Sequence, residues 1–302
     1  MMFARPRSLI PAGTLGAMCG LLLGCGGSAS GPAAPQTAQA SKAAQSAQAS
    51  QQAGNGRFSQ PLAVDNPMFP LAVGTQFSYV GKIVKDGESK PHSVTFTVTD
   101  VSKVVDGVQT VVAWDRDFLE GKLQEQELAF FAQDDQGNVW NFGEYPEEYE
   151  GGKFTGAPST WIRGVDSAYG GIHMLSQPRA GMKYREGLVP AIEFDDVSVV
   201  TRTGQQTCLA AHCYQQVLVV DETSPNDPTS GHQIKYYSPP TGLIQVAARG
   251  GDTQEFLTLT SVRHLGQAEM ATIRTEVLAM DRRAYRVSKV YRTTKPAEQH
   301  QG

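Results

Sequence analysis

Motifs that build common active sites are sparse in this sequence of 302 residues. No GxSxG nucleophile motif and no glycine-rich phosphate loop occurs, so serine hydrolase and phosphate-binding chemistry have no support. The histidines form no HxxxH or HxH pair, which leaves a zinc hydrolase equally unsupported; they are His92, His173, His212, His232, His264 and His300. We therefore expect a protein that is not an enzyme, with no catalytic residue, metal site or cofactor. A hydrolase whose site is assembled from residues distant in sequence is the third-ranked alternative.

Positive charge is also scarce. Lysine and arginine number 26 against 30 aspartates and glutamates, a net charge of −4 that becomes −6 if Arg5 and Arg7 are removed with a signal peptide. A domain this acidic, without a basic stripe to displace counterions, is not expected to bind nucleic acid. After the N-terminus no hydrophobic run reaches the about 20 residues that span a bilayer. We therefore expect membrane attachment through the N-terminal segment only.

Residues 1–24 resemble a bacterial lipoprotein signal peptide. A basic head precedes an apolar stretch that proline and glycine interrupt, and this stretch is too short and broken for a comfortable spanning helix. It ends in Leu22-Leu23-Gly24-Cys25, which is similar to a lipobox. The resemblance implies a diacylglycerol thioether on Cys25, cleavage before Cys25 and acylation of the new amino terminus, a stronger hold than one acyl chain provides. An uncleaved anchor and a plain secretory signal are the alternatives.

Residues 25–60 join the lipidated Cys25 to a stretch of alanine, serine, glutamine, glycine and proline. This composition buries too little apolar surface to offset its ordering entropy, so we predict a disordered linker; a helix over part of it is the alternative. We place the protein in the cell envelope, lipid-anchored to a membrane, with the domain on the non-cytoplasmic side. Gly26 stands where an aspartate resembles an inner-membrane retention signal, which favours the outer membrane if the cell has two membranes.

Residues 61–265 are predicted to form one antiparallel β domain. Apolar and polar residues alternate, as in SVTFTVTD, where Val94, Phe96 and Val98 share one face. Eight further segments of this kind are separated by turn signals such as Asp106-Gly107. Because short connections join antiparallel neighbours, we expect a mainly β protein. It should have a curved antiparallel sheet or open barrel of about ten strands and one C-terminal amphipathic helix.

Residues 144–190 interrupt this period with recurrent glycine and proline. We expect an irregular segment that covers one end of the sheet and holds at most a strand or two, with a functional loop as the alternative. Its first part, the acidic run Glu144 to Glu150, is interpreted as a solvated loop, and attraction of a cation or a basic partner is the alternative. Just before it, Asp134 to Asn138 lacks the spacing of a calcium loop, so we expect a hairpin turn.

Helical spacing marks residues 266–291. The apolar positions fall on one face and predict a helix that packs on the sheet; they are Ile273, Val277, Met280, Ala284 and Val287. Acidic residues come early and basic residues late, which suits the helix dipole. The basic end, with Arg292 and Lys295, is a candidate for contact with anionic lipid headgroups. Residues 292–302 are predicted to be a disordered tail.

Two cysteines remain in the predicted β domain, because Cys19 lies in the signal and Cys25 is the lipid site. Cys208 and Cys213 have four residues between them, and in an exported domain we predict that they close a hairpin as a disulfide. A redox pair normally has two intervening residues. A metal cluster of Cys208, His212 and Cys213 lacks a fourth ligand. These two readings are the alternatives.

Five stretches resemble a family of uncharacterised bacterial secreted lipoproteins. They are NPMFPLAVGTQFSYVG (Asn66 to Gly81), DDQGNVWNFGE (Asp134 to Glu144), TWIRGVDSAYGGIHM (Thr160 to Met174), YREG (Tyr184 to Gly187) and KYYSPPTGLIQV (Lys235 to Val246). Family members look like NPxFPLxxGTxxxYxG, DGNVWxFGE and KYYxPxxGLV at these places. The sequence departs at Gln136, where aspartate is more usual, and at TCLAAHCYQQ, where relatives tend to have a shorter turn. The resemblance implies a secreted β-rich domain and no known activity.

These features predict a membrane-anchored envelope lipoprotein with a non-catalytic binding role. A hydrophobic small molecule is the first ligand class, since some curved antiparallel sheets with a helix over one face enclose an apolar cavity; this is an analogy at the level of the fold. An envelope protein is the other partner considered. The alternative function is a structural or protein-interaction module of the envelope whose sheet has a solid core.

Overall fold

The computed structural model describes residues 56–210 and 212–300. The strands are β1 (Thr75–Lys85), β2 (Glu88–Val105), β3 (Val108–Leu119), β4 (Lys122–Gln133), β5 (Val139–Glu150), β6 (Lys153–Gly156), β7 (Trp161–Ile162), β8 (Tyr169–Gly170), β9 (Ile172–Met174), β10 (Lys183–Val189), β11 (Phe194–Leu209), β12 (His212–Thr223), β13 (His232–Ser238), β14 (Gly242–Arg249), β15 (Thr253–His264) and β16 (Glu298–Gln299). The α-helix is α2 (Gln267–Val287), and the 3-10 helices are η1 (Pro190–Ile192), η2 (Pro228–Ser230) and η3 (Tyr291–Thr293). No helix among the described residues is long and apolar enough to cross a membrane.

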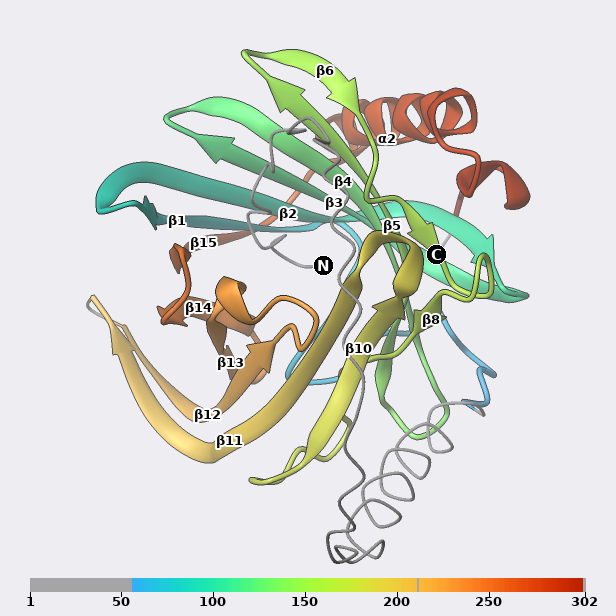
Figure 1. Cartoon of the computed structure of the whole chain (residues 1–302). Helices are drawn as coiled ribbons and strands as arrows, with labels where there is room; N and C mark the ends of the chain where they lie inside the picture. Colours follow the sequence, from blue (N-terminus) through green and yellow to red (C-terminus); the bar gives the residue numbers. More distant parts are fainter. Residues whose placement is uncertain (1–55, 211, 301–302) are drawn as a thin grey trace, which may run out of the picture. The chain divides into compact units, whose positions relative to one another are not determined.

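All these strands belong to one antiparallel sheet (Figure 1). Its main path runs β6-β5-β4-β3-β2-β1-β15-β14-β13-β12-β11-β10-β8, while β7 and β9 pair with β5 and β16 pairs with β2. Most neighbours on this path are consecutive in the chain, as short connections predict. The pairing of β1 with β15 brings the first long strand beside the last. The prediction of a mainly β protein with a curved antiparallel sheet and a C-terminal helix is confirmed, although the sheet has sixteen strands rather than about ten.

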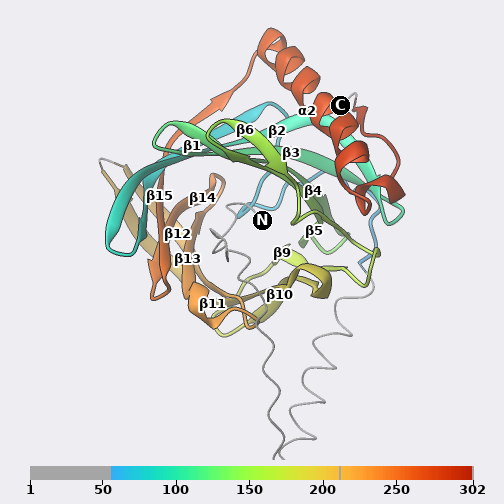
Figure 2. The ribbon, with the colours of Figure 1, turned by 45° about the horizontal axis from the view of Figure 1, so that its top comes forward.

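The sheet bends into a deep curve, with β1 to β6 facing β10 and β11 across its concave side (Figure 2). The path ends at β6 and β8, so the sheet does not close into a barrel. Buried apolar side chains from most of the long strands form the core on this concave side. Val64, Phe69 and Leu71, which precede β1, pack into the same core. Part of the concave side is therefore filled by the chain itself.

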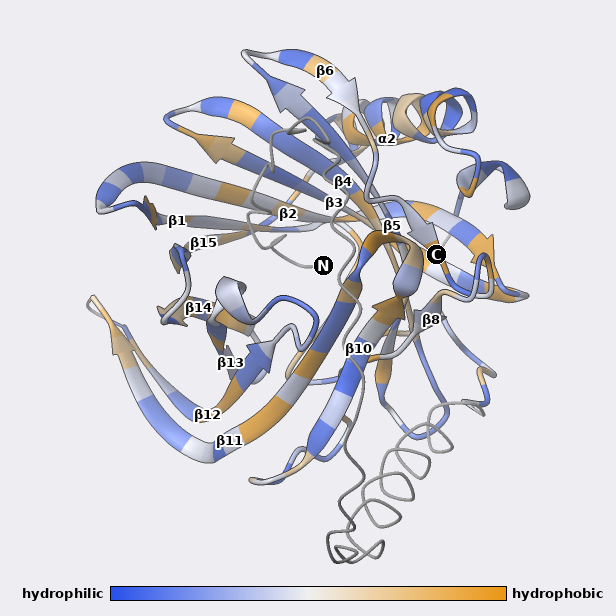
Figure 3. Cartoon of the chain, viewed as in Figure 1, coloured by the Kyte–Doolittle hydropathy of each residue, from blue (hydrophilic) through white to orange (hydrophobic). Residues whose placement is uncertain are grey.

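Two-residue alternation decides which side chains reach the core. Val94, Phe96 and Val98 of β2 are buried there, as predicted, while Ser93 and Thr95 between them are half-buried. Hydrophobic and hydrophilic bands also alternate along β11 (Figure 3). Successive side chains of a strand point to opposite faces, so this alternation separates a concave face from an outer face.

The helix α2 packs on the outer face of the sheet, over β2 and β4 (Figure 2). Its buried apolar residues include three of the predicted stripe, whereas Ile273 and Val287 are only half-buried; the buried set is Met270, Val277, Met280 and Ala284. Two arginines attach the helix by ion pairs, Arg274 to Asp100 at 2.6 Å and Arg283 to Glu147 at 2.6 Å. The helix ends at Val287, earlier than the predicted 291, because the chain turns there into η3.

The prediction of a disordered tail over residues 292–302 is wrong for the described part of that tail. Glu298 and Gln299 form β16 beside β2, and the backbone N–H of Ala297 donates to Asp281 at 3.2 Å. Lys103 reaches from β2 to the Lys295 carbonyl at 2.7 Å. Side chains that sequence periodicity does not connect therefore hold the tail on the sheet.

The folded domain also begins before residue 61, inside the predicted linker of residues 25–60. Ser59 donates two hydrogen bonds to the Asp135 carboxylate, from its N–H at 2.7 Å and its hydroxyl at 2.8 Å. The Phe58 ring packs edge-on against Trp140 and Phe142 of β5. The predicted signal at residues 1–24 and the lipid site Cys25 lie outside the described residues.

Residues 144–190 hold more structure than the predicted strand or two. They contain the end of β5, the short strands β6 to β9, and β10. Gly171 donates its N–H to the Glu186 carbonyl of β10, and its own carbonyl accepts from Asn141 of β5. A β-carbon at Gly171 would lie 2.0 Å from the Arg185 carbonyl oxygen, so glycine permits this close contact. The weak periodicity reflects strands of two to four residues.

Candidate functional site

The tip of the β11–β12 hairpin carries the predicted disulfide. Cys208 and Cys213 face each other across the two strands and are bonded in the structure. Their Cα atoms are 3.9 Å apart, so the bond reinforces a turn that the strands already define. The disulfide engages both sulfur atoms, so neither is free to ligate a metal in this state.

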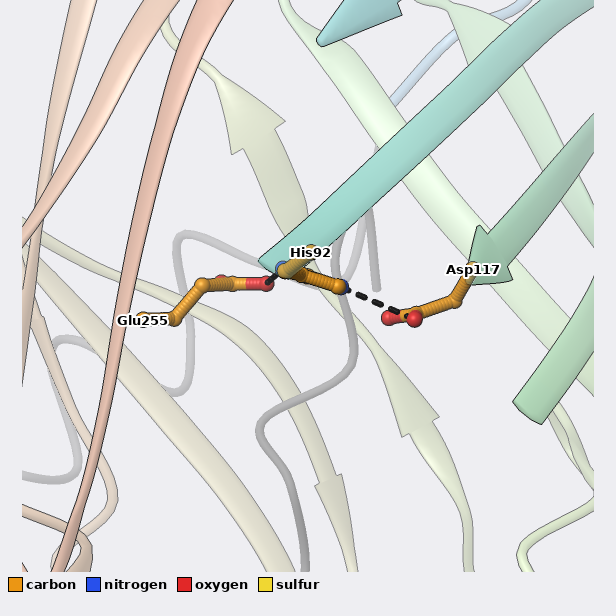
Figure 4. A group of neighbouring side chains, drawn as sticks. All are labelled: His92, Asp117 and Glu255. Atoms are coloured by element: carbon orange, nitrogen blue, oxygen red, sulfur yellow. Dashed lines mark ion pairs between the residues drawn. The ribbon is translucent and has the colours of Figure 1, made fainter. Parts of the chain in front are cut away.

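His92, Asp117 and Glu255 form a compact group on the concave face (Figure 4). The His92 imidazole lies between the two carboxylates, with Nε2 at 2.8 Å from Asp117 and Nδ1 at 3.4 Å from Glu255. The three residues come from β2, β3 and β15. The side chains of His92 and Glu255 are almost wholly buried, while that of Asp117 is 21% exposed. We call these residues the His92 group.

Gly81 of β1 helps to bring the His92 group together. It pairs with His92 on one side and with Leu257 of β15 on the other. A β-carbon at this position would lie 1.7 Å from the Phe256 carbonyl oxygen. Because glycine lets β1 and β15 approach closely and adds no side chain, Glu255 can reach His92 across β1.

Burial and charge shift the pKa values within the His92 group. Burial raises the pKa of Glu255 to about 7, opposed by His92 and reinforced by Asp117. Burial alone would lower the pKa of His92, but the hydrogen bond and charge of Asp117, together with the charge of Glu255, raise it. The imidazole therefore favours its charged form, and Glu255 holds its proton more firmly than an exposed glutamate.

A second polar group extends from β13 across the concave face to β9. Lys235 donates to Glu222 at 2.6 Å, Ser198 donates to Glu186 at 2.5 Å, and His173 Nδ1 lies 3.0 Å from Glu186. Burial disfavours the charge on Glu186, yet His173 and Lys235 outweigh it and hold the pKa of this glutamate below its usual range. Burial lowers the pKa of His173. We call this set the Glu186 network.

The order of contacts in the Glu186 network differs from that of a nucleophilic triad. Ser198 bonds to the Glu186 carboxylate and not to the imidazole, so the histidine is not placed to take its proton. Ser198 and His173 are also almost fully buried. The network joins strands β9 to β13, and its geometry does not indicate a catalytic site.

Carboxylates face one another across β3, β4 and β5. Asp115 lies opposite Glu127, Asp117 opposite Glu125, and Glu125 opposite Glu148. Asp115 and Asp117 follow the core residue Ala113 at two-residue spacing, and Glu125 and Glu127 precede the core residue Ala129 in the same way, which places them on the concave face. We call these five residues, Asp115, Asp117, Glu125, Glu127 and Glu148, the carboxylate row. Like charges at directly facing positions of a sheet repel one another, so the row carries a concentrated negative charge.

Glu125 shows the electrostatic effect of the carboxylate row. Its side chain is only partly exposed, and desolvation followed by the charges of Glu127 and Asp117 raises its pKa well above the usual range. A cation placed among these groups would relieve the mutual repulsion and favour their ionised forms.

The acidic run from Glu144 to Glu150 is a strand and not the predicted solvated loop. It forms the second half of β5, and its residues alternate between the two faces of the sheet. Glu144 accepts hydrogen bonds from Asn141 and from the Trp161 indole at 2.9 Å. Glu147 lies on the other face and binds Arg283 of α2. Buried partners on both faces thus explain an acidic composition that resembles a loop.

The segment from Asp134 to Asn138 is a turn between β4 and β5, as predicted. The Asp134 carboxylate accepts hydrogen bonds from the backbone N–H of Gln136 at 2.9 Å and of Asn138 at 2.8 Å. It also accepts one from the Trp140 indole at 2.8 Å. These donors occupy the oxygens that a calcium ion would need.

Sequence reasoning did not single out the His92 group or the carboxylate row. His92 and Glu255 are far apart in the chain, and no local spacing connects them. One signal was present: Asp115, Asp117, Glu125 and Glu127 stand at alternate positions on the two strands of one hairpin, where alternation places them on one face. Of the predicted residues, the structure joins Cys208 to Cys213, whereas Cys25 lies outside the described residues.

Comparison with known proteins gives two structural likenesses. No protein-family model and no curated protein matches the chain. One similar crystal structure is that of a protein from Bacteroides fragilis, which is described as exported and of YmcC-like fold. The two sequences are 13% identical, the alignment covers 66% of this chain and 99% of that chain, and the TM-score is 0.37. Another is that of a protein from Parabacteroides distasonis, which is described as a lipoprotein. Here the identity is 12%, the alignment covers 66% of this chain and 99% of that chain, and the TM-score is 0.36. Likeness at this level carries no argument about function, and the resemblance to secreted lipoproteins stays a prediction.

Proposed function

We propose that this chain is a lipid-anchored envelope protein whose folded domain binds a positively charged small molecule on the concave face of its sheet, without catalysis. The lipobox at Cys25 supports the anchor, and the Cys208–Cys213 disulfide suits an oxidising compartment outside the cytoplasm. The linker predicted after Cys25 would give the domain reach from the membrane surface.

The carboxylate row is the observation that carries the proposal. Its five members lie on three adjacent strands, on the face that also carries the core. Carboxylates gathered on one face give that face a negative potential, and such a surface attracts a positively charged ligand. An organic amine matches this surface, because it offers positive charge and several N–H donors to carboxylate oxygens.

The carboxylate row changes the ligand class expected from the sequence. A wholly hydrophobic molecule would remove water from these carboxylates and supply no hydrogen bond in return, at a cost of several kcal/mol. Phe69, in contact with Phe131 and the His173 ring, already fills part of the apolar core. We therefore expect charge complementarity, and not apolar burial, to dominate recognition.

The test uses the lipidated full-length protein, purified in a nonionic detergent and titrated with spermidine by calorimetry. We expect saturable binding that weakens as salt is added, because salt screens the attraction between the amine and the partly exposed Asp117, Glu125 and Glu148. The double variant Glu125→Gln and Glu127→Gln should weaken binding by about tenfold or more, which corresponds to about 1.4 kcal/mol. Triethylene glycol, a neutral chain of comparable size, should not bind.

A matched control carries the same change of charge elsewhere. Glu88 and Glu150 are exposed glutamates near the ends of β2 and β5, and the double variant Glu88→Gln and Glu150→Gln should keep the spermidine affinity of the wild type. Equal losses in both double variants would show a general effect of net charge. Absence of saturable binding would remove the proposal and favour an interaction module with a solid core.

A further inference from the structure

The His92 group has the composition and the geometry of a metal-binding site. One nitrogen of His92 and one oxygen each of Asp117 and Glu255 lie within 4.8 Å of one another. Figure 4 shows both carboxylates pointing toward the imidazole from opposite sides. Metal ions bound by histidine nitrogen and carboxylate oxygen lie about 2.0–2.2 Å from each ligand. Because the carboxylates contact opposite ring nitrogens, the imidazole or one carboxylate has to turn to bring all three into one coordination shell.

A fourth side chain gives independent evidence of a ligand at this place. Gln233 of β13 donates its Nε2 to Glu255 at 2.8 Å, while its Oε1 has no hydrogen-bond partner. Gln233 is 5% exposed, so this oxygen is buried without compensation. Glu255 Oε1 is likewise buried and has no hydrogen bond, and its nearest charged partner is His92 Nδ1 at 3.4 Å. Buried polar atoms are normally satisfied, and a cation beside Glu255 would satisfy the Gln233 oxygen once the amide is turned toward it.

We propose that His92, Asp117 and Glu255 bind one divalent first-row transition-metal ion, with the side-chain oxygen of Gln233 as a fourth ligand. A half-turn of the Gln233 amide exchanges its nitrogen for its oxygen on the side of Glu255. One imidazole with carboxylate and carbonyl oxygens is a donor set suited to Zn²⁺ or Mn²⁺. Mg²⁺ and Ca²⁺ prefer sites built from oxygen alone.

The surrounding charges suit a bound cation. Asp117 faces Glu125 across β3 and β4, so a further carboxylate lies beside the site. Lys235, the other positive group that acts on Glu255, donates its ammonium to Glu222 at 2.6 Å. The local balance is therefore negative, and the ligands come from β2, β3, β13 and β15 of one sheet, which holds them in fixed positions.

This inference goes beyond the proposed function and does not rest on amine binding, although Asp117 belongs to both sets. Zinc binding without spermidine binding would keep the metal site and remove the proposed function. Spermidine binding without zinc binding would do the reverse.

The test measures zinc binding to the lipidated full-length protein, made without a histidine tag, stripped with a chelator and then dialysed free of it. Calorimetry with ZnCl₂ should give one ion per chain. His92→Gln and Asp117→Asn should each weaken the affinity by about 100-fold or more, since loss of an outer-shell partner alone costs about 10- to 100-fold. Zinc should raise the melting temperature of the wild type and leave that of each variant unchanged.

A second histidine–aspartate pair provides the matched control. His232 of β13 lies 2.7 Å from Asp221 of β12, and its side chain is 36% exposed. The double variant His232→Gln and Asp221→Asn should keep one zinc ion at wild-type affinity. Wild-type protein with no saturable zinc binding would overturn the inference, and so would zinc binding that survives in both His92→Gln and Asp117→Asn.

If a ligand variant fails to fold, the wild-type protein still decides the question. Cobalt(II) bound by one nitrogen and several oxygens gives visible absorption bands that change with its ligands, and zinc should displace it in equal amount. Bands identical to those of cobalt in buffer would contradict a built site.

Discussion

The Lys103 ammonium lies 3.0 Å from the Asp281 carboxylate, where β2 meets α2. Lys103 also donates to the Tyr285 hydroxyl, and Tyr291 donates to Asp281 at 2.7 Å. Burial lowers the pKa of Lys103, with the charge of Asp281 acting in the opposite direction. This buried pair therefore fastens the helix and the C-terminal segment to the outer face of the sheet.

Replacing one member of that pair should strongly destabilise the domain. Asp281→Asn leaves the buried Lys103 charge without its counterion, and we expect a loss of about 3–5 kcal/mol in the free energy of unfolding. Urea unfolding followed by tryptophan fluorescence measures it. Arg263→Gln, which breaks the exposed pair with Glu269, is the control and should change the midpoint little. Similar effects of the two variants would contradict the role given to Lys103 and Asp281.

The raised pKa of Glu255 predicts a specific pH dependence for the metal-free protein. Glu255 titrates at about 7 in the folded chain against 4.5 ordinarily, so between these values the folded state binds more protons than the unfolded state. Protonation of Glu255 contributes about 3 kcal/mol to the free energy of unfolding. This contribution is fully present below pH 4.5 and is lost as the pH rises through about 7. Urea unfolding of wild type and Glu255→Gln in chelator, across pH 5 to 8 (roughly the window of the shift), should show the wild type losing stability relative to the variant. A constant difference would refute the assignment.

The disulfide between Cys208 and Cys213 should give only modest stability. The closed loop is short, so the chain-entropy model predicts a loss of about 2 kcal/mol when both cysteines become serine. Thermal unfolding measures this loss, and thiol labelling before and after reduction counts the bond directly. The same thiol count under both conditions would mean that the bond does not form.

Cys25 should be the site of lipid attachment. Cys25→Ser removes the thiol, so we expect loss of lipid labelling and a signal segment that the lipoprotein peptidase does not cleave. Metabolic labelling with a fatty-acid analogue and intact mass measurement test both points, with Cys19→Ser as the control that should remain lipidated. Lipid on the Cys25→Ser protein would exclude the predicted anchor.

The sequence determined the fold class because side-chain alternation is a local property. Val94, Phe96 and Val98 indicate a half-buried strand from their own spacing, and the residues between Cys208 and Cys213 indicate a hairpin in the same way. The helix after residue 265 was equally visible from its apolar period. Its end was not, since η3 begins where Tyr291 packs against Asp281, a contact that helical spacing does not report.

Tertiary structure alone decided the candidate sites. His92 and Glu255 meet only because β1 pairs with both β2 and β15, and because Gly81 between them has no side chain. The acidic run from Glu144 resembles a solvated loop until its residues are divided between two faces, one of which is covered by α2. Strand order and burial depend on the whole chain, so a local pattern predicts which residues are charged but not which of them share a buried site.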